Sequence, residues 1–165
     1  MKTLRERILN VEAYPFNFNE IKRILQKRCP GMKMRFVFEG DHNFKGLFKN
    51  KVNVCFVLCE VGALHHWVVF TKKHFYDPIA MKESFWAETF PKLHAYIVKE
   101  KLEMNTFQHE KNKAKVNTCG LHCVIRAAHW NMTNKEFHQF LTSIMPGKSD
   151  FLVSLMCYLG SLSIV

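Results

Sequence analysis

KVNVCFVLCEVGALHHWVVFTKKHFYDP, residues 51–78, contains three strand signals in succession. Residues 51–61 are β-branched and apolar, which is typical of a buried strand, and the Gly-Ala-Leu-His run that follows interrupts it. Residues 66–70 and 74–78 then have the length and composition of two short strands joined by Thr-Lys-Lys. We therefore expect a β-hairpin here, preceded by a buried strand.

The expected hairpin brings a histidine toward a carboxylate. If the strands pair across Thr-Lys-Lys, Phe70 lies near His74, and position 66 falls opposite positions 77 to 79. In two of these three registers His66 and Asp77 share a face, directly opposite or on the diagonal, which is close enough to interact. The hairpin thus predicts a His66–Asp77 pair. The alternative is a strand-end histidine near the surface, with Asp77 as an ordinary turn residue.

Before the hairpin, the pattern predicts a helix, a strand and a loop. Residues 17–28 predict an amphipathic helix that Cys-Pro-Gly ends. Its N-cap is expected to be Asn17 or Asn19, and its inward face is formed by Ile21, Ile24 and Leu25. Residues 33–50 predict a short strand and then a glycine-bearing loop.

After the hairpin, helical signals dominate. Residues 82–102 are helical in pattern, with Pro91 as an interruption or a fresh start, and residues 103–108 predict another strand. Thr133 and Glu136 form a capping box for a later helix, and Ser149 or Asp150 is expected to cap the final one. The order of elements predicts one α+β domain over residues 1–165, with a small, mainly antiparallel sheet.

The composition fits a globular domain with anionic partners. The 165 residues are 48% hydrophobic and carry a net charge of +10, which favours nucleic acid, acidic proteins or membrane surfaces as partners. Residues 1–53 hold twelve Lys and Arg against five Asp and Glu, so the surplus is concentrated there. The start lacks the apolar core of a signal peptide, so we expect reduced cysteines. The apolar tail over 151–165 is too short to span a bilayer.

VNTCGLHCVIRAAHW, residues 116–130, places a cysteine where a helical pattern begins. After Cys119, one helical face is marked by Leu121, Val124, Ile125 and Ala128. A thiol at a helix start lies near unpaired backbone N–H groups and the positive end of the helix dipole, and both favour the thiolate. The same N–H groups can bind an oxyanion. Cys119 is therefore a candidate nucleophile, whereas Cys123 suits a buried structural position.

HHWVVF, FYDP and TCGLHC, in this order, resemble the adenovirus protease (adenain) family and its wider clan, which includes the SUMO-specific cysteine proteases. That clan has His-Trp on a strand, an acid on the next strand, a Gln before the nucleophile, and Cys-Gly opening a helix. The resemblance covers roughly residues 54–130. It implies a cysteine-protease fold with the chain order His, acid, Cys, in which His66 is the base, Asp77 orients it and Cys119 attacks.

The oxyanion glutamine of the clan has no direct match in this chain. It lies six or seven residues before the Cys, where this sequence has Lys113 and Asn112. Gln108, eleven residues before Cys119, is the nearest glutamine, and we expect it to take this role because a strand end would fix its side chain. Asn112 is the second choice. An exposed Gln108 without a role is the plain alternative.

The resemblance implies a viral cysteine endopeptidase that cleaves precursor proteins during virion maturation. It implies cleavage at small residues, often Gly, with no cofactor for the chemistry but stimulation by DNA and by a short activating peptide. The expected location is the host nucleus and the virion, without membrane association. Proteases for ubiquitin-like modifiers, and acetyltransferases with the same triad, belong to the same clan and remain alternatives.

The basic charge predicts a DNA contact on the helix at 17–28. Opposite its apolar stripe lie Lys22, Arg23, Lys27 and Arg28. Together with Lys45, Lys49 and Lys51 they would form a patch that binds phosphates without sequence preference. A non-catalytic nucleic-acid-binding protein is therefore a competing interpretation, and a solvated helix face is the simplest one.

Metal binding is the remaining alternative. Cys119, His122 and Cys123 share a helix face, and His65 or His66 would complete a zinc site. Cys55 and Cys59 cannot substitute, because on a strand they lie about 13 Å apart. The chain has no second C-x-x-C knuckle, so the nucleophile interpretation is preferred.

Overall fold

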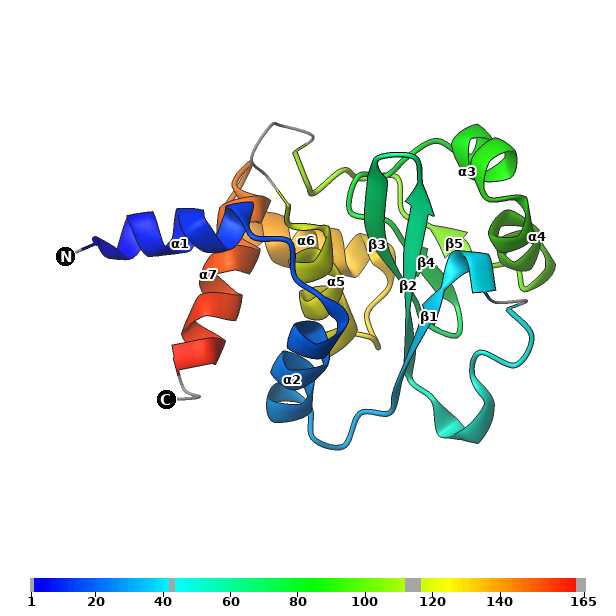
Figure 1. Ribbon diagram of the computed structural model, residues 1–165, viewed down its shortest axis with the longest axis horizontal. Helices are drawn as coiled ribbons and strands as arrows, with labels where there is room; N and C mark the ends of the chain where they lie inside the picture. Colours follow the sequence, from blue (N-terminus) through cyan, green and yellow to red (C-terminus); the bar gives the residue numbers. More distant parts are fainter. Residues whose placement is uncertain (1, 42–43, 112–116, 163–165) are drawn as a thin grey trace.

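A five-stranded sheet forms the middle of the molecule in a computed structural model that describes residues 2–41, 44–111 and 117–162 (Figure 1). Its strand order follows the chain, β1-β2-β3-β4-β5. The strands are β1 (Met34–Phe38), β2 (Val54–Val61), β3 (Leu64–Phe70), β4 (His74–Tyr76) and β5 (Glu103–Met104). The predicted hairpin is β3–β4, and the predicted buried strand before it is β2.

The sheet is mixed, which corrects the expectation of a mainly antiparallel one. β2–β3 and β3–β4 are antiparallel, but β1 runs parallel to β2 and β5 runs parallel to β4. Parallel neighbours need long crossover connections. Two 3₁₀ turns, Glu39–Asp41 and Lys49–Lys51, lie between β1 and β2, and two helices, α3 (Glu83–Thr89) and α4 (Pro91–Lys99), lie between β4 and β5. These connections return the chain to the same end of the sheet.

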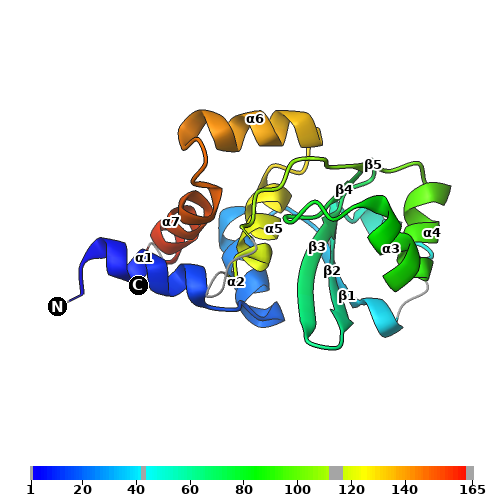
Figure 2. The same cartoon turned by 90° about the horizontal axis from the view of Figure 1, so that it is seen from above.

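Helices cover both faces of the sheet (Figures 1 and 2). α3 and α4 pack on one face. The other face carries α2 (Phe18–Arg28), α5 (Cys119–Ala128), α6 (Asn134–Ile144) and α7 (Ser149–Leu162), and α1 (Leu4–Ala13) lies against α7. Because neighbouring strand residues point to opposite faces, β2 serves both layers. Val54 and Phe56 join the core with α5, whereas Cys55 and Val57 join the core with α3 and α4.

α5 is the most enclosed of these helices. The expected helix begins at Cys119, but its burial is not confined to one face, because every residue from Gly120 to Ala127 is buried. Ala128, expected on the inward face, is only half-buried. α5 lies between β3 on one side and α2 and α7 on the other. A helix that is buried all round must supply partners for its polar side chains, here His122 and Arg126.

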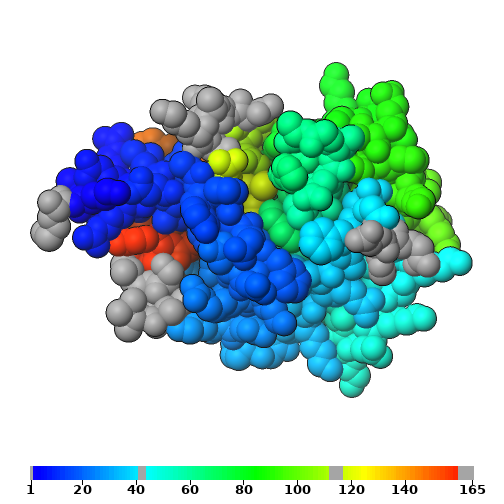
Figure 3. Space-filling model, in the orientation of Figure 1, coloured from blue at the N-terminus to red at the C-terminus, as the bar shows by residue number. Residues whose placement is uncertain are grey.

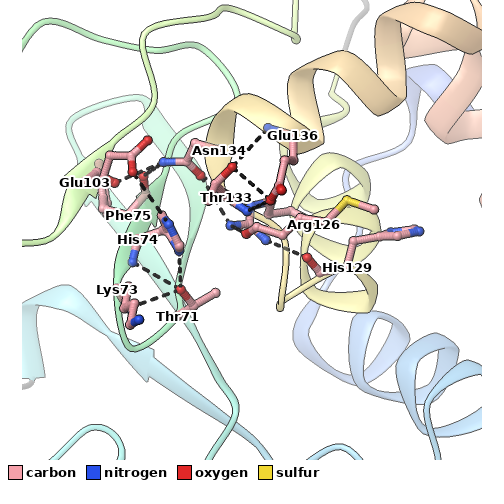
Figure 4. A network of polar contacts seen from close by, with 11 residues as sticks. Thr71, Lys73, His74, Phe75, Glu103, Arg126, His129, Thr133, Asn134 and Glu136 are labelled. Atoms are coloured by element: carbon pink, nitrogen blue, oxygen red, sulfur yellow. Dashed lines mark hydrogen bonds and ion pairs between the residues drawn. The ribbon is translucent and has the colours of Figure 1, made fainter.

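A polar network anchors the far end of α5 to the sheet (Figure 4). The buried Arg126 donates to the carbonyls of His129 and Met132, both at 2.9 Å. Asn134, the first residue of α6, donates from its amide to the carbonyls of Phe75 at 3.1 Å and Glu103 at 3.0 Å. The C-terminal end of α5 and the start of α6 are thereby held against β4 and β5.

Most of the expected helix starts are confirmed. Asn17 caps α2, Pro91 starts α4 afresh, and the capping box of Thr133 and Glu136 is present. Two expectations were wrong. The strand over 103–108 is only the two residues of β5. Ser149 and Asp150 lie inside the first turn of α7 and bond instead to the segment before Cys119.

Candidate active site

Cys119 is a half-buried free thiol at the first position of α5. Its neighbour Gly120 permits close packing, because a Cβ there would lie 3.3 Å from Ile21 Cδ1 and 3.4 Å from Trp67 Cδ1. Trp67 also donates from its indole to the carbonyl of Phe16 at 3.3 Å. The start of α5 is therefore packed closely between α2 and β3, and this packing fixes the position of the Cys119 sulfur.

His66 and Asp77 form the predicted pair. His66 Nε2 lies 2.7 Å from Asp77 Oδ1, and both side chains are buried. The observed hairpin pairs Val69 with Tyr76 and Phe70 with Phe75, so His66 and Asp77 are diagonal neighbours, one of the two favourable registers. Asp77 is itself held in place, because its two oxygens accept the backbone N–H groups of Ile79 and Met81 at 2.9 and 2.8 Å.

The His66 ring is arranged to carry a proton beside Cys119. Burial opposes the charge, but hydrogen bonds and charge interactions with Asp77 and Cys119 outweigh it and raise the pKa of His66 to about 10. With Nε2 engaged by Asp77, Nδ1 is the ring nitrogen left for Cys119. An imidazolium held by a carboxylate and facing a cysteine is the arrangement that nucleophilic thiol chemistry requires.

Glu110 is a third ionisable side chain close to His66 and Cys119, and the sequence analysis did not identify it. One donor atom each from His66, Glu110 and Cys119 lie within 4.8 Å of one another. Glu110 is 5% exposed, and its Oε1 accepts the N–H of Thr118 at 3.1 Å. Its Oε2 is buried without a hydrogen-bond partner among the described residues. Burial raises the pKa of Glu110 to about 7, against the opposing effects of His66 and the Thr118 N–H.

Gln108 does not have the environment expected of it. β5 ends at Met104, so Gln108 is not at a strand end. Its side chain is exposed, and its amide donates to the carbonyl of Glu110 at 2.9 Å. Asn112, the second choice, lies outside the described residues. The usable signal was Glu110 itself, nine residues before Cys119, since glutamate has the shape of glutamine.

Asp150 of α7 organises the segment around Cys119. Its Oδ1 accepts the hydroxyl of Thr118 at 2.5 Å and lies 3.0 Å from His122 Nε2. Its Oδ2 accepts the N–H of Lys111 at 3.0 Å. Burial opposes the charge of Asp150, but the His122 and Thr118 hydrogen bonds outweigh it and lower its pKa. Asp150 thus holds the residue before Cys119 and the residue after Glu110 together.

An apolar groove of about 580 Å³ opens beside Cys119. In Figure 3 the yellow start of α5 reaches the surface between the blue N-terminal segment and the green β2–β3 region. Cys119 and Gly120 line the groove together with large apolar side chains, namely Phe16, Phe18, Phe38, Leu58 and Trp67. The sequence did not reveal this groove, because its walls come from five separate segments of the chain.

The zinc set considered from the sequence is not assembled. His122 is hydrogen-bonded to Asp150, and Cys123 Sγ contacts the carbonyl of Trp67 at 3.3 Å. His65 pairs instead with Glu60 at 2.8 Å, at the surface. Burial raises the pKa of Cys123 well above its ordinary value, which suits a structural thiol rather than a metal ligand. The side chains near Cys119 that offer donor atoms are His66 and Glu110.

The basic face of α2, defined as Lys22, Arg23, Lys27 and Arg28, is exposed opposite the buried Ile21, Ile24 and Leu25. Arg28 also donates to the carbonyl of Met156 in α7. Lys45 and Lys49 do not join this face. They line a separate depression of about 590 Å³ with Lys92 and Lys99 of α4, on the other side of the sheet. The single patch expected from the sequence is therefore divided.

The comparisons with known proteins do not assign the chain to a family. It matches no protein-family model, and no curated protein is significantly similar to it. Within the described residues, every helix is too short or too polar to serve as a membrane span.

Proposed function

We propose that the protein is a cysteine endopeptidase of the adenovirus-protease type. The observation that carries the proposal is the buried His66, which is hydrogen-bonded to Asp77 at 2.7 Å and lies beside Cys119 at the start of α5. These residue types in this arrangement supply a nucleophile, a base and a group that orients the base. The open groove beside Cys119 supplies room for an extended peptide.

In this proposal the His66 imidazolium and the Cys119 thiolate form the reactive pair. The sulfur attacks the carbonyl carbon of the scissile peptide bond, and His66 gives its proton to the leaving amine. A thioester with Cys119 remains. His66 then takes a proton from water, which attacks the thioester and releases the second product with Cys119 restored. Asp77 keeps the ring oriented and stabilises its charge throughout.

Glu110 replaces Gln108 as the proposed oxyanion donor. A protonated glutamic acid presents an O–H where glutamine presents an N–H, and buried acids can act as neutral hydrogen-bond donors. The Thr118 N–H occupies Oε1, which leaves Oε2 to carry the proton toward the oxygen that becomes negative. With a pKa of about 7, the donor form is abundant at neutral pH and disappears in alkali.

The groove favours a substrate with a large apolar side chain close to the scissile bond. Its walls at Phe16, Phe38 and Leu58 are aromatic or aliphatic, and apolar pockets discriminate by size and hydrophobic burial. Viral precursor proteins, and an activating peptide, belong to the proposal on the strength of the sequence resemblance. A protease for ubiquitin-like modifiers is the alternative within the same chemistry.

DNA is the proposed polyanionic partner. The basic face of α2 presents its charges away from the core, and the groove beside Cys119 remains open. Phosphate contacts of this kind give binding without sequence preference. In the proposal, DNA raises cleavage or confines it to DNA-packed particles in the nucleus and the virion.

The experiment that tests the enzyme compares Cys119→Ala with Cys29→Ala, since Cys29 is the other half-buried thiol. The purified chain is incubated with a diverse peptide library, and the new ends are identified by mass spectrometry. We expect cleavage by the wild type and Cys29→Ala and none by Cys119→Ala, which should still fold. Cleavage that survives in Cys119→Ala would refute the proposal. Cleavage restricted to the tail of a ubiquitin-like protein would favour the alternative, and transfer from acetyl-CoA without cleavage would indicate an acetyltransferase.

A further inference from the structure

The side chains of His66, Glu110 and Cys119 form a donor cluster suited to a metal ion. Each contributes one donor atom, and these atoms lie within 4.8 Å of one another. In a tetrahedral zinc site with bonds near 2.0–2.3 Å, ligand atoms are separated by about 3.5 Å. The donors therefore need to close by at most about 1.3 Å. Within the described residues, no other group of three such side chains meets this criterion.

Two features show that this cluster is suited to bind a metal. Glu110 Oε2 is buried and has no hydrogen-bond partner in the described part of the chain, so this oxygen is available to bind a metal ion. His66 Nε2 is bonded to Asp77, which leaves Nδ1 to bind a metal. A ligating histidine whose other nitrogen is held by a carboxylate is the usual arrangement at zinc sites.

The ligand types select the ion. A thiolate, an imidazole and a carboxylate together suit zinc, whereas calcium and magnesium prefer oxygen ligands throughout. Three protein ligands leave a fourth position for water, and the groove that Cys119 lines gives solvent access to it.

We propose that His66, Glu110 and Cys119 bind one zinc ion, which holds the nucleophile as a metal thiolate and stops cleavage reversibly. The site differs from the zinc set considered from the sequence, since it excludes His122 and Cys123. Binding is a property of the three side chains alone. The inhibitory consequence rests on the proposed function, because it needs Cys119 to be the nucleophile.

A second group of histidines is the competitor for the metal. His109 Nε2 lies 2.9 Å from His138 Nδ1, and His109 Nδ1 lies 2.8 Å from the hydroxyl of Tyr76. Both nitrogens of His109 are thus engaged within the protein. His138→Ala is the variant that separates the two locations.

The test is a calorimetric titration of the metal-free full chain with zinc chloride, repeated with cobalt to record the thiolate-to-cobalt absorption band. We expect one ion per chain and affinity that weakens as the pH falls, because protons compete for the ligands. Glu110→Gln should weaken zinc binding at least about tenfold, and Cys119→Ser should abolish the cobalt band. Glu88→Gln, at an exposed site, and Cys29→Ser are the matched controls and should bind as the wild type does.

Absence of binding, binding that Glu110→Gln and Cys119→Ser leave unchanged, or binding abolished by His138→Ala would each overturn the site. The cleavage assay then separates this inference from the proposed function. Zinc that stops cleavage, with recovery on chelation, supports both. Zinc bound through Glu110 and Cys119 in a chain that never cleaves peptides supports the site and refutes the protease. Cleavage that is lost on chelation and restored by zinc refutes the inhibitory role and the thiol mechanism together.

Discussion

Replacing Glu110 with Gln keeps the shape of the side chain but removes its dependence on protonation. Glutamine keeps an acceptor for the Thr118 N–H and always presents an N–H donor at the position of Oε2. The wild-type donor exists only while Glu110 is protonated, and its pKa is about 7. Turnover that depends on this donor should fall about tenfold between about pH 6 and pH 8 in the wild type. The Gln variant should lose this fall.

Titration of His66 does not contribute to the pH dependence between about pH 6 and pH 8, because its pKa of about 10 keeps it protonated across this range. The assay is kcat/KM for one peptide across the pH range, for the wild type, Glu110→Gln, Glu110→Ala and the surface control Glu88→Gln. Glu110→Ala should lose about 10²-fold at pH 6, as removal of an oxyanion donor does, and only about tenfold at pH 8, where most of the wild-type donor has lost its proton. A wild-type rate that stays level or rises over this range, or a Gln variant with the wild-type slope, would refute the role of Glu110.

The same substitution has a stability signature that needs no substrate. The folded pKa of Glu110 is raised from 4.5 to about 7, so its contribution to stability is present below about pH 4.5 and is lost between about pH 4.5 and pH 7. That loss amounts to about 3 kcal/mol, or roughly 6 to 12 °C in Tm for a chain of this size. Comparison of thermal unfolding at about pH 4.5 and pH 7.5 should show this loss in the wild type and not in Glu110→Gln.

Three further outcomes follow from the site and its surroundings. His66→Ala should remove nearly all turnover, and Asp77→Ala should cost less, with Asp77→Asn partly active; equal rates in all three, measured as kcat, would contradict the triad. Gly120→Ala should lower the free energy of unfolding by about 1–3 kcal/mol, because the added Cβ lies 3.3 Å from Ile21 Cδ1. An unchanged denaturation midpoint would show that the Ile21 side chain moves aside without cost. Changing the four residues of the basic face of α2 to Gln should flatten the salt dependence of DNA binding, whose slope is about −0.9 per phosphate neutralised. Cleavage without DNA should remain intact. DNA binding that does not depend on salt would contradict a phosphate-binding role and indicate that the charge serves solubility only.

Features that depend on residues close together in the sequence were predicted correctly, whereas features that depend on distant residues were not. The His66–Asp77 pair was predictable because a tight turn fixes the diagonal of a hairpin from a few residues. The caps at Asn17 and Thr133 were predictable for the same reason, since each depends on a residue three positions away. These features are decided by local geometry and do not need the rest of the chain.

Strand direction and the position of Glu110 were not predicted, because both depend on long connections between the elements. Whether β5 runs parallel to β4 is decided by α3 and α4 between them, and no local pattern encodes that return. Glu110 reaches Cys119 because Asp150, from α7, holds Lys111 and Thr118. A search restricted to glutamine therefore settled on Gln108, which is exposed. Chemical equivalence between Glu and Gln leads instead to Glu110, which the structure brings close to His66 and Cys119.

The contact between Thr118 and Asp150 has a kinetic consequence. It joins the residue before Cys119 to a side chain 32 positions later in the chain. Contacts of long sequence separation form late, because the loop between them must close first, and they slow the refolding of a domain. During refolding from denaturant, native-like helix content should therefore return before the alkylation rate of Cys119 changes from its value in the unfolded chain to its native value. The time of that change would report the docking of α7, and an Asp150→Asn variant would delay it without slowing the recovery of helix.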